Sequence, residues 1–307
     1  MKRNIAFIYC FASMLCWSVS PVLVRYIKDY FSVSFQNFFR FAVAIVIMWS
    51  FTLLTIGGRT AWNSLKSISY SLPKLFLVAV CNFCHQIFLI KGVYLLMPGL
   101  VTIVEESTII FSTTLAYIFI PAERSLIRKP AFMAGLLMAV AGVVITSLPE
   151  LSGVKDFAGD SPVMGLLFVF ISSLAWAGFS LMIKLWFTDV PSAVTSSIVF
   201  TLVIPIFLIS ILFDKGPALL QACIPVKIWL LTIVSGIIGI GLGYSFYYQS
   251  IKGLGIALNS SLGLLIPVIT AVISFLFLGE RLLPVQIAGA IVLLSGSLIV
   301  VRAEGQT

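Results

Sequence analysis

Long apolar runs, each separated from the next by a short polar stretch, make up nearly the whole chain. A helix needs about 20 mostly apolar residues to cross the hydrocarbon core of a bilayer. Runs of roughly that length occupy residues 4–24, 36–56, 74–95, 99–120, 131–149, 163–183, 193–213, 227–250, 255–278 and 284–301. The pattern therefore predicts an all-α membrane protein with ten transmembrane helices.

The connections between these runs are brief, as in Gly57-Gly58-Arg59 and Asp160-Ser161-Pro162, and none is long enough to hold a soluble domain. No segment has the phosphate-binding pattern Gly-x-x-x-x-Gly-Lys-Ser/Thr, so any transport is expected to run on gradients rather than on ATP. The first apolar run, from Ile5 to Val24, lacks a small-x-small cleavage site, and we expect it to stay as a helix.

Composition supports the membrane class and narrows the partners. Only 10% of the 307 residues are charged, against about 25% in soluble domains. The net charge of +8 comes from Lys and Arg at the ends of apolar runs, where they orient the chain and meet anionic lipid headgroups. We therefore expect a lipid bilayer and a small-molecule substrate as partners, with no nucleic acid, and either a monomer or a homodimer.

The two halves of the chain repeat each other. Trp17 precedes Arg25 by the same spacing as Trp176 precedes Lys184. Further matches in the same order are Lys91-Gly92 with Lys252-Gly253, residues 119–124 with 277–281, and Gly135 and Gly142 with Gly289 and Gly296. We divide the chain into repeats at residues 1–150 and 151–307. Five spans per repeat give the halves opposite orientations in the membrane, an architecture of secondary transporters with the substrate site between the halves.

Several motifs also point to a known family. They are Trp17, Arg40-Phe41-x-x-Ala44, Lys91-Gly92-x-Tyr94, Lys252-Gly253, Ile266-Pro267-Val268 and Phe277-Leu278-Gly279-Glu280-Arg281. In this order the chain resembles the EamA-type, ten-helix members of the drug/metabolite transporter superfamily.

The resemblance implies a carrier of the cell inner membrane with both termini in the cytoplasm and alternating access to a central cavity. It also implies a metabolite substrate such as an amino acid, frequent export, and a cavity formed mainly by the third, fourth, eighth and ninth helices. The fifth and tenth helices would be peripheral.

Glu105 and Glu106 lie about two turns into the fourth apolar run. An ionisable group at that depth costs roughly 2.5–3.5 kcal/mol on insertion scales and indicates function. One of the two can face a cavity and bind a substrate ammonium or exchange a proton, because neighbours on a helix point about 100° apart. Alternatively, they form a structural pair with Arg40 or Lys91.

The repeat favours Glu106 of the two. Asn259, Gly263 and Pro267 correspond to Thr102, Glu106 and Ile110, and both sets have the spacing of one helical face. The polar Asn259 and the small Gly263 indicate that this face lines the cavity, so Asn259 and Glu106 are predicted substrate-binding residues.

The third run carries Asn82, His85 and Gln86 on one polar face. His85 is the only histidine and is a second candidate for proton coupling; simple hydrogen bonding between helices remains the alternative. Cys81-Asn82-Phe83-Cys84-His85 spells a c-type haem attachment pattern, but inside a spanning helix we interpret it as a chance match. We therefore expect no cofactor and no metal.

Aromatic residues complete the candidate set. Trp17 and Trp176 occupy equivalent positions in the two repeats, and their indole N–H groups need partners, so they either face the cavity or pack in the core. Tyr244 and Tyr248 share a face, where they stack on a planar solute or belong to the aromatic belt. The glycines of the eighth run, including Gly239, allow close helix packing or bending.

These patterns favour a secondary active transporter, an exporter or exchanger of a small organic metabolite such as an amino acid. A membrane-embedded enzyme is the main alternative, but the sequence lacks Gly-x-Ser-x-Gly, His-Glu-x-x-His and an intramembrane aspartate pair. A channel would be expected to show rings of charge or a carbonyl filter, and neither is recognisable.

Overall fold

The fold confirms the ten predicted spans. The computed structural model describes residues 3–69, 71–121, 124–152, 162–187, 189–214 and 224–304. Ten helices in this part of the chain are long and apolar enough to cross a membrane. Their bounds are Arg3–Tyr26, Val33–Ile56, Leu72–Leu95, Pro98–Phe119, Pro130–Leu151, Pro162–Trp186, Ser192–Ile211, Val226–Leu254, Leu258–Leu278 and Pro284–Ala303.

Seven of these spans are single helices, and three are built from shorter pieces. The single helices are α1 (Arg3–Tyr26), α2 (Val33–Ile56), α4 (Leu72–Leu95), α8 (Pro130–Leu151), α9 (Pro162–Trp186), α10 (Ser192–Ile211) and α15 (Pro284–Glu304). The fourth span joins α5 (Pro98–Glu105) to α6 (Thr108–Phe119), and the ninth joins α13 (Ile256–Gly263) to α14 (Ile266–Leu278). The eighth joins α11 (Val226–Ser235), a π-helix (Gly236–Leu242) and α12 (Gly243–Leu254).

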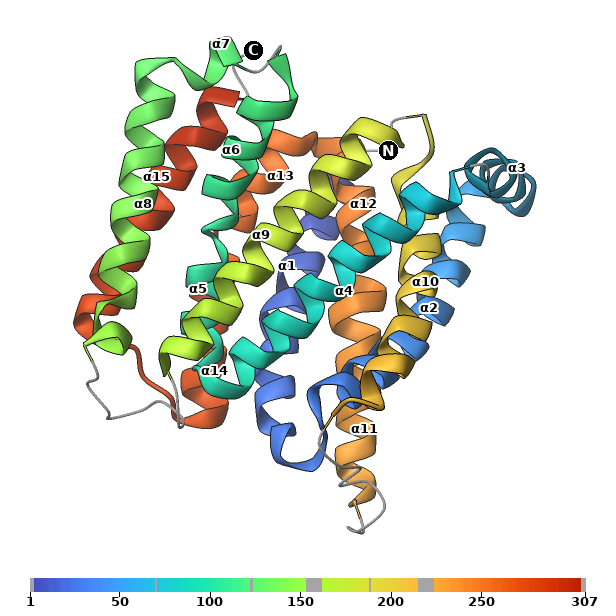
Figure 1. The fold of residues 1–307 in the computed structure, drawn as a ribbon, viewed down its shortest axis with the longest axis horizontal. Helices are drawn as coiled ribbons and strands as arrows, with labels where there is room; N and C mark the ends of the chain where they lie inside the picture. The colour runs from blue at the N-terminus through green and yellow to red at the C-terminus, as the bar shows by residue number, and fades with distance from the viewer. Residues whose placement is uncertain are drawn as a thin grey trace.

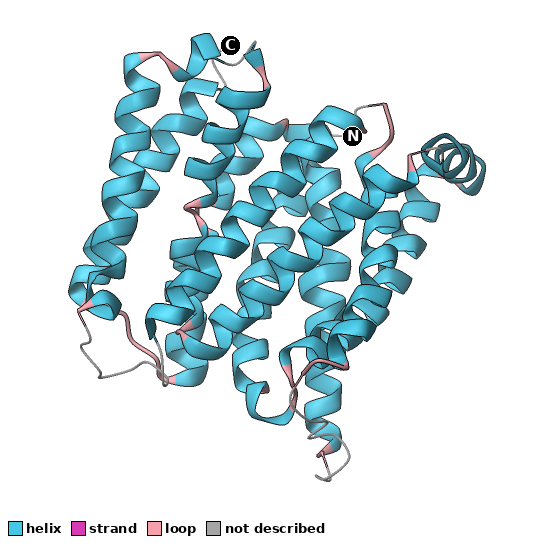
Figure 2. Cartoon of the chain, viewed as in Figure 1, coloured by secondary structure: helices cyan, strands magenta, loops and turns pink. Residues whose placement is uncertain are grey.

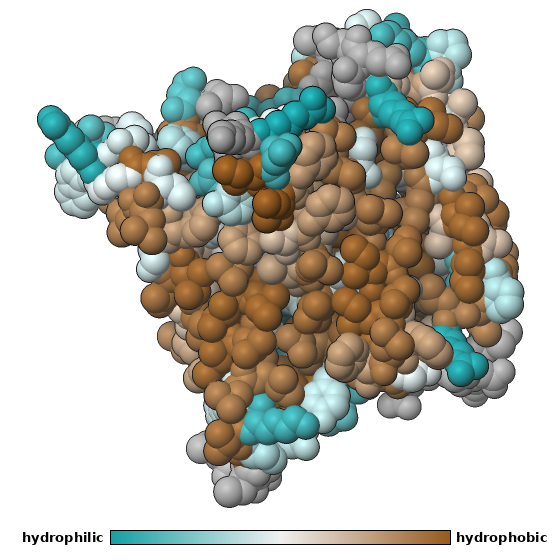
Figure 3. Space-filling view, turned by 180° about the vertical axis from the view of Figure 1, so that it is seen from behind, coloured by the Kyte–Doolittle hydropathy of each residue, from teal (hydrophilic) through white to brown (hydrophobic). Residues whose placement is uncertain are grey.

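The outer surface of the bundle is apolar between its two ends. Figure 3 shows a broad hydrophobic band on one face, with hydrophilic side chains gathered above and below it. Side chains such as Leu54, Leu137 and Ile291 lie within spans and are exposed. In water such a surface would be unfavourable, but in a bilayer it faces lipid chains.

The stretch after Gly57, expected to be part of a loop, is a helix, α3 (Gly58–Ser69). Its sequence is amphipathic: Ala61 and Ile68 are buried, whereas Trp62 is exposed beneath the ammonium group of Lys66, 5.5 Å from the ring centroid. A short helix with a tryptophan and basic residues suits the membrane surface rather than a span. Figure 1 places α3 near the end of the bundle where both termini lie.

The fourth and ninth spans are interrupted at corresponding places in the two repeats. In the fourth, Glu106 and Ser107 form a tight turn in which their N–H groups donate to the carbonyls of Ile103 and Val104. In the ninth, the N–H of Leu265 donates to Leu262 in the same way. Figure 2 shows the loop residues between α5 and α6 in the middle of the bundle. Discontinuous helices at matching points of inverted repeats are typical of transporter binding sites.

The repeated glycines of the fifth and tenth spans bring α8 and α15 into close contact. A methyl group added to Gly142 would lie 2.6 Å from Leu293 Cβ, and one added to Gly296 would lie 2.8 Å from Met138 Cβ. This pair of helices stands at one edge of the molecule (Figure 1). Its small residues allow the backbones to approach, as is common in membrane helix pairs.

Candidate functional site

A cavity of about 250 Å³ lies at the middle of the spans, where Trp17, Glu105 and Gly239 sit near the centres of their helices. Its lining comes from the first to fourth, sixth, eighth and ninth spans, with no lining residue from α8, α10 or α15. The predicted site residues that line it are Trp17, His85, Gln86, Glu105, Glu106, Trp176 and Tyr244. Further lining residues that the sequence reasoning did not select include Ser20, Arg40, Thr102, Thr108 and Gly239.

Both glutamates stand at the break between α5 and α6. Glu105 is the last residue of α5, and Glu106 begins the tight turn that follows, with a right-handed helical backbone. The sequence had predicted that only one of the two would face the cavity, because neighbours on a helix point about 100° apart. Both line the cavity, and the Glu105 side chain keeps 27% of its surface exposed. The backbone of Glu105 is also held by α9, because the Ser173 hydroxyl donates a hydrogen bond of 3.3 Å to its carbonyl.

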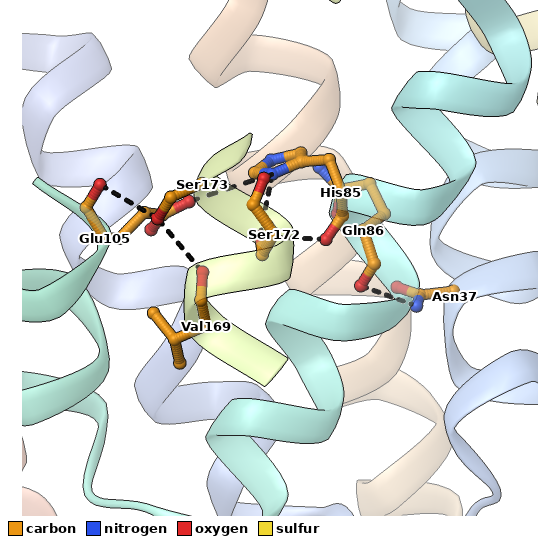
Figure 4. A network of polar contacts seen from close by, with 7 residues as sticks. All are labelled: Asn37, His85, Gln86, Glu105, Val169, Ser172 and Ser173. Atoms are coloured by element: carbon orange, nitrogen blue, oxygen red, sulfur yellow. Dashed lines mark hydrogen bonds and ion pairs between the residues drawn. The ribbon is translucent and has the colours of Figure 1, made fainter. Parts of the chain in front are cut away.

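His85 links the glutamates to α9. Its ring nitrogen Nδ1 lies 2.9 Å from the Ser172 hydroxyl oxygen and 4.0 Å from Glu105 Oε1. The Ser172 hydroxyl also reaches the His85 carbonyl at 3.0 Å, which holds the imidazole in place. Figure 4 shows Glu105, Ser173, Ser172 and His85 side by side, with Gln86 directly after His85 on α4. A carboxylate and an imidazole so placed have the chemistry for proton exchange.

Gln86 reaches the cavity on the side of α2. It is buried, and its backbone carbonyl accepts a hydrogen bond of 3.3 Å from the amide of Asn37 (Figure 4). Asn37 in turn accepts from Arg40, at 3.3 Å from Nη1. The polar face of α4 is therefore continuous with the polar groups of α2.

Asn82, Tyr248 and Asn259 lie away from the lining of this cavity. Asn82 is fully buried, and neither of its amide atoms has a hydrogen-bond partner among the described residues. The hydroxyl of Tyr248 is hydrogen-bonded to Ser196. Asn259 is buried and accepts a hydrogen bond of 2.5 Å from Ser250. A role of these three side chains in substrate binding stays a prediction.

Three aromatic side chains form one wall of the cavity. The rings of Trp17 and Tyr244 meet edge to face at 5.2 Å, and Tyr244 lies 6.0 Å from Trp176. Trp176 continues the row to His85, 4.8 Å away. Trp17 approaches so closely because Gly243 has no side chain: an added methyl group would lie 2.7 Å from Trp17 Nε1. The wall offers flat apolar surface between the polar groups.

Arg40 is the functional candidate that sequence reasoning overlooked. The sequence indicated only a family motif residue and a possible structural partner of the glutamates, yet Arg40 lies two turns inside α2 and is 3% exposed. Its Nη2 donates to the Ser20 hydroxyl at 2.8 Å, and Gly239 of the π-helix makes room beside it. The rule that selected Glu105 and Glu106, an ionisable residue within a span, applies equally to Arg40.

The cations proposed as structural partners of the glutamates do not pair with them. Among the described residues, neither Arg40 nor Lys91 forms an ion pair with Glu105 or Glu106. The ammonium group of Lys91 instead lies over the rings of Phe88 and Phe168, 5.5 Å from each centroid. The described part of the cavity thus contains carboxylates and a guanidinium group that do not neutralise each other directly.

The haem-like pattern lies within a spanning helix. Cys81 and Cys84 are free thiols in α4, next to His85. In the described residues no three His, Cys, Asp or Glu side chains gather closely enough to hold a metal ion.

A polar network lies against one end of the cavity. Arg25, one turn beyond the lining residue Pro21, pairs with Glu280 at 3.1 Å. Its Nη1 also donates to the carbonyl of Val93, another lining residue, at 3.1 Å. Ser274 donates to the second oxygen of Glu280 at 2.9 Å. The network joins α1 and α4 of the first repeat to the loop between α14 and α15 of the second.

Comparison with known proteins agrees with this architecture. A curated relative from Bacillus subtilis, an uncharacterized transporter, is 24% identical over 90% of this chain and 87% of its own length. A relative from Salmonella typhimurium, named "Probable amino-acid metabolite efflux pump", is 25% identical over 83% of this chain and 91% of its own length. A solved crystal structure that is 17% identical shares the fold, with a TM-score of 0.64 over 97% of this chain and 96% of that chain.

The family comparison covers both repeats. The EamA-like transporter family matches residues 4–148 and again residues 163–302, with five of the spans in each stretch. This double match fits the two inverted five-helix repeats predicted from the sequence. The protein is therefore a multi-pass membrane protein that belongs to the EamA-like transporter family.

Proposed function

We propose that this protein is a secondary active transporter that exports or exchanges a small organic metabolite of the amino-acid type by alternating access. The observation that carries the proposal is the central cavity, where two glutamates at a broken helix have no Lys or Arg partner among the described residues. Buried charges are costly unless they are paired. A charged solute that enters the cavity supplies the missing partner.

The size of the cavity supports a small solute. Pockets for drug-sized ligands usually measure about 300–1,000 Å³, and this cavity of about 250 Å³ falls below that range. Its walls combine an aromatic row with a few polar groups, which suits one compact polar metabolite. The relative named as an efflux pump for an amino-acid metabolite supports the same substrate type and the outward direction.

The Arg25 network provides a closed end for alternating access. It crosses from one repeat to the other, so a rocking motion of the repeats must break it. Opening at this end would then expose the cavity to the side of the membrane that is opposite the two termini.

Glu106 and His85 are the candidates to exchange a proton for the substrate, since both line the cavity.

The orientation is proposed from charge, and the membrane from the family. We place both termini in the cytoplasm, because loop Lys and Arg gather on that side, and we place the protein in the cell inner membrane, as its resemblance to the EamA-type carriers implies. Figure 1 shows α3 and α7 (Arg124–Ile127), which carry several of these cations, at the same end as the termini. Lys2, Lys155 and Lys215, which also lie at or between the ends of spans, are outside the described residues.

Counterflow in liposomes tests the proposal. Purified protein is reconstituted into liposomes loaded with an unlabelled amino acid, and uptake of the labelled amino acid is followed over a range of concentrations. We expect saturable uptake that Glu106→Gln abolishes and that Lys91→Gln, outside the cavity, leaves unchanged. Flux that neither saturates nor responds to a gradient for any metabolite in a broad panel would contradict a carrier.

A further inference from the structure

The guanidinium group of Arg40 is a buried cation with incomplete partners. Both of its described hydrogen-bond acceptors, Ser20 and Asn37, are neutral. Nε has no partner among the described residues. A guanidinium group has five N–H donors, and these two bonds leave the others free to bind an acceptor. A buried charge without a counter-ion is unfavourable, so the site is poised for an anion.

The residues around Arg40 indicate that its unpaired N–H groups face the cavity. Ser20 and Gly239, which contact or flank the guanidinium group, are themselves lining residues. A planar guanidinium group fits a carboxylate in a two-pronged arrangement. The π-helix at Gly236–Leu242 lies beside this group, and π-helical turns often occur at functional sites.

Carboxylate groups, which carry the opposite charge to Arg40, line a different part of the same cavity. Glu105 and Glu106 stand at the break between α5 and α6, beside His85. Tyr244 lines the cavity together with Glu105 and Arg40, and the aromatic row runs from it through Trp176 to His85, which lies beside Glu105. An ammonium group needs several oxygen acceptors, and a pair of carboxylates supplies them.

From this arrangement we propose that the cavity binds a zwitterionic amino acid, with its carboxylate on Arg40 and its ammonium group on Glu105 and Glu106. The side chain of the solute lies against Trp17, Tyr244 and Trp176. This inference rests on the proposed function and adds to it: Arg40 is a substrate-binding residue, and both head-group charges are required. A simple amine lacks the carboxylate that Arg40 would bind, and an uncharged metabolite lacks both charged groups.

Binding to the purified protein in detergent tests the inference with matched probes. The probes are L-leucine, 3-methylbutylamine, which lacks the carboxylate, and 4-methylpentanoate, which lacks the ammonium group. L-phenylalanine, 2-phenylethylamine and 3-phenylpropanoate form a second set. We expect at least one of the two amino acids to bind about tenfold or more tightly than its amine and its acid, a factor equivalent to about 1.4 kcal/mol.

Substitutions then assign each charge. Arg40→Gln should weaken binding of the amino acid about tenfold and leave the amine unaffected, whereas Glu105→Gln combined with Glu106→Gln should weaken the amine and spare the acid. Arg40→Lys keeps the charge without the planar fork, and its affinity should be intermediate. Lys91→Gln is the matched control, because this cation lies outside the cavity. Thermal unfolding of each variant shows whether it is folded.

Three binding results would overturn the inference. They are equal binding of amino acid and amine by the unmodified protein, unchanged amino-acid affinity in a folded Arg40→Gln variant, and no binding of either amino acid. The proposed function fails separately: selective binding without any counterflow would refute transport but not recognition, whereas saturable counterflow of solutes that lack a carboxylate would refute recognition but not transport.

Discussion

At the scale of single residues, the cavity depends on positions where a side chain is absent as much as on those where one is present. Gly239 makes room for Ser20, the partner of Arg40, and Gly243 makes room for Trp17. The sequence indicated that the glycines of the eighth run allow close packing, but it did not show what they approach. The structure identifies their neighbours as two side chains of the candidate site.

Gly243→Ala should therefore disturb the site. The added methyl group would lie 2.7 Å from Trp17 Nε1 and 2.9 Å from Cδ1, so the indole must move. Overpacking of this kind costs about 1–3 kcal/mol, and we expect weaker amino-acid binding with a lower midpoint of thermal unfolding. Gly263→Ala is the control, because nothing lies within 4 Å of its added methyl group. Equal effects of the two substitutions would show that Trp17 is not held by this contact.

At the scale of helices, continuity of a span could not be deduced from hydropathy. The fourth and ninth spans are apolar throughout their lengths, yet each is two helices. Apolar length reports whether a segment enters the membrane, whereas the break depends on a few residues whose N–H groups bond three residues back. Only a match between the repeats, such as Glu106 with Gly263, indicated that these places were special.

The ion pair between Arg25 and Glu280 yields a prediction at this scale. Arg25→Gln or Glu280→Gln removes the link between α1 and the loop before α15, so the cavity should open more often at that end. In a variant without native cysteines, we expect a cysteine at Val101, a lining position, to react several times faster with an impermeant thiol reagent added from that side.

Two further variants make this test specific. Arg25→Glu combined with Glu280→Arg should return the reaction rate toward that of the unmodified pair. Arg281→Gln, next to Glu280 but directed over the ring of Phe275, should have no effect. Unchanged reactivity in both single variants would mean that the network is not the barrier at this end.

At the scale of the whole molecule, the distribution of charge predicts how the protein sits in the membrane. Asp29 follows α1 and Asn63 lies in α3, and both side chains are exposed. With cytoplasmic termini, a single cysteine at position 29 should be labelled by an impermeant thiol reagent in intact cells. One at position 63 should react only after the membrane is permeabilised. The reverse pattern would place the termini outside.

The division of the chain at residues 150 and 151 remains a prediction at this scale. Position 150 lies in the last turn of α8, and the residues from 153 to 161 lie outside the described part of the chain. The family matches end at 148 and resume at 163, on either side of that stretch. The peripheral position implied for the fifth and tenth helices agrees with the pairing of α8 and α15 at one edge.

The sequence alone determined the ten spans, the duplication and the membrane class, because hydropathy and repeat spacing are properties of the chain read in order. It also marked Glu105, Glu106 and His85 through the cost of polar groups in a bilayer. It did not determine which polar groups meet. Periodicity places a residue on a face of its own helix, but the rotation of one helix against another depends on packing across the bundle.

Only the tertiary structure decided which polar groups meet, because packing across the bundle fixes how each helix is rotated against its neighbours. Asn82 and His85 share one face of α4, yet only His85 reaches the cavity, because α9 presents Ser172 and Trp176 to it. Glu105 and Glu106 both line the cavity, although helix geometry alone predicted that only one would. Arg40, a motif residue in the sequence, is a buried cation that lines the same cavity, because the fold brings Ser20 of α1 and Asn37 of α2 to its guanidinium group.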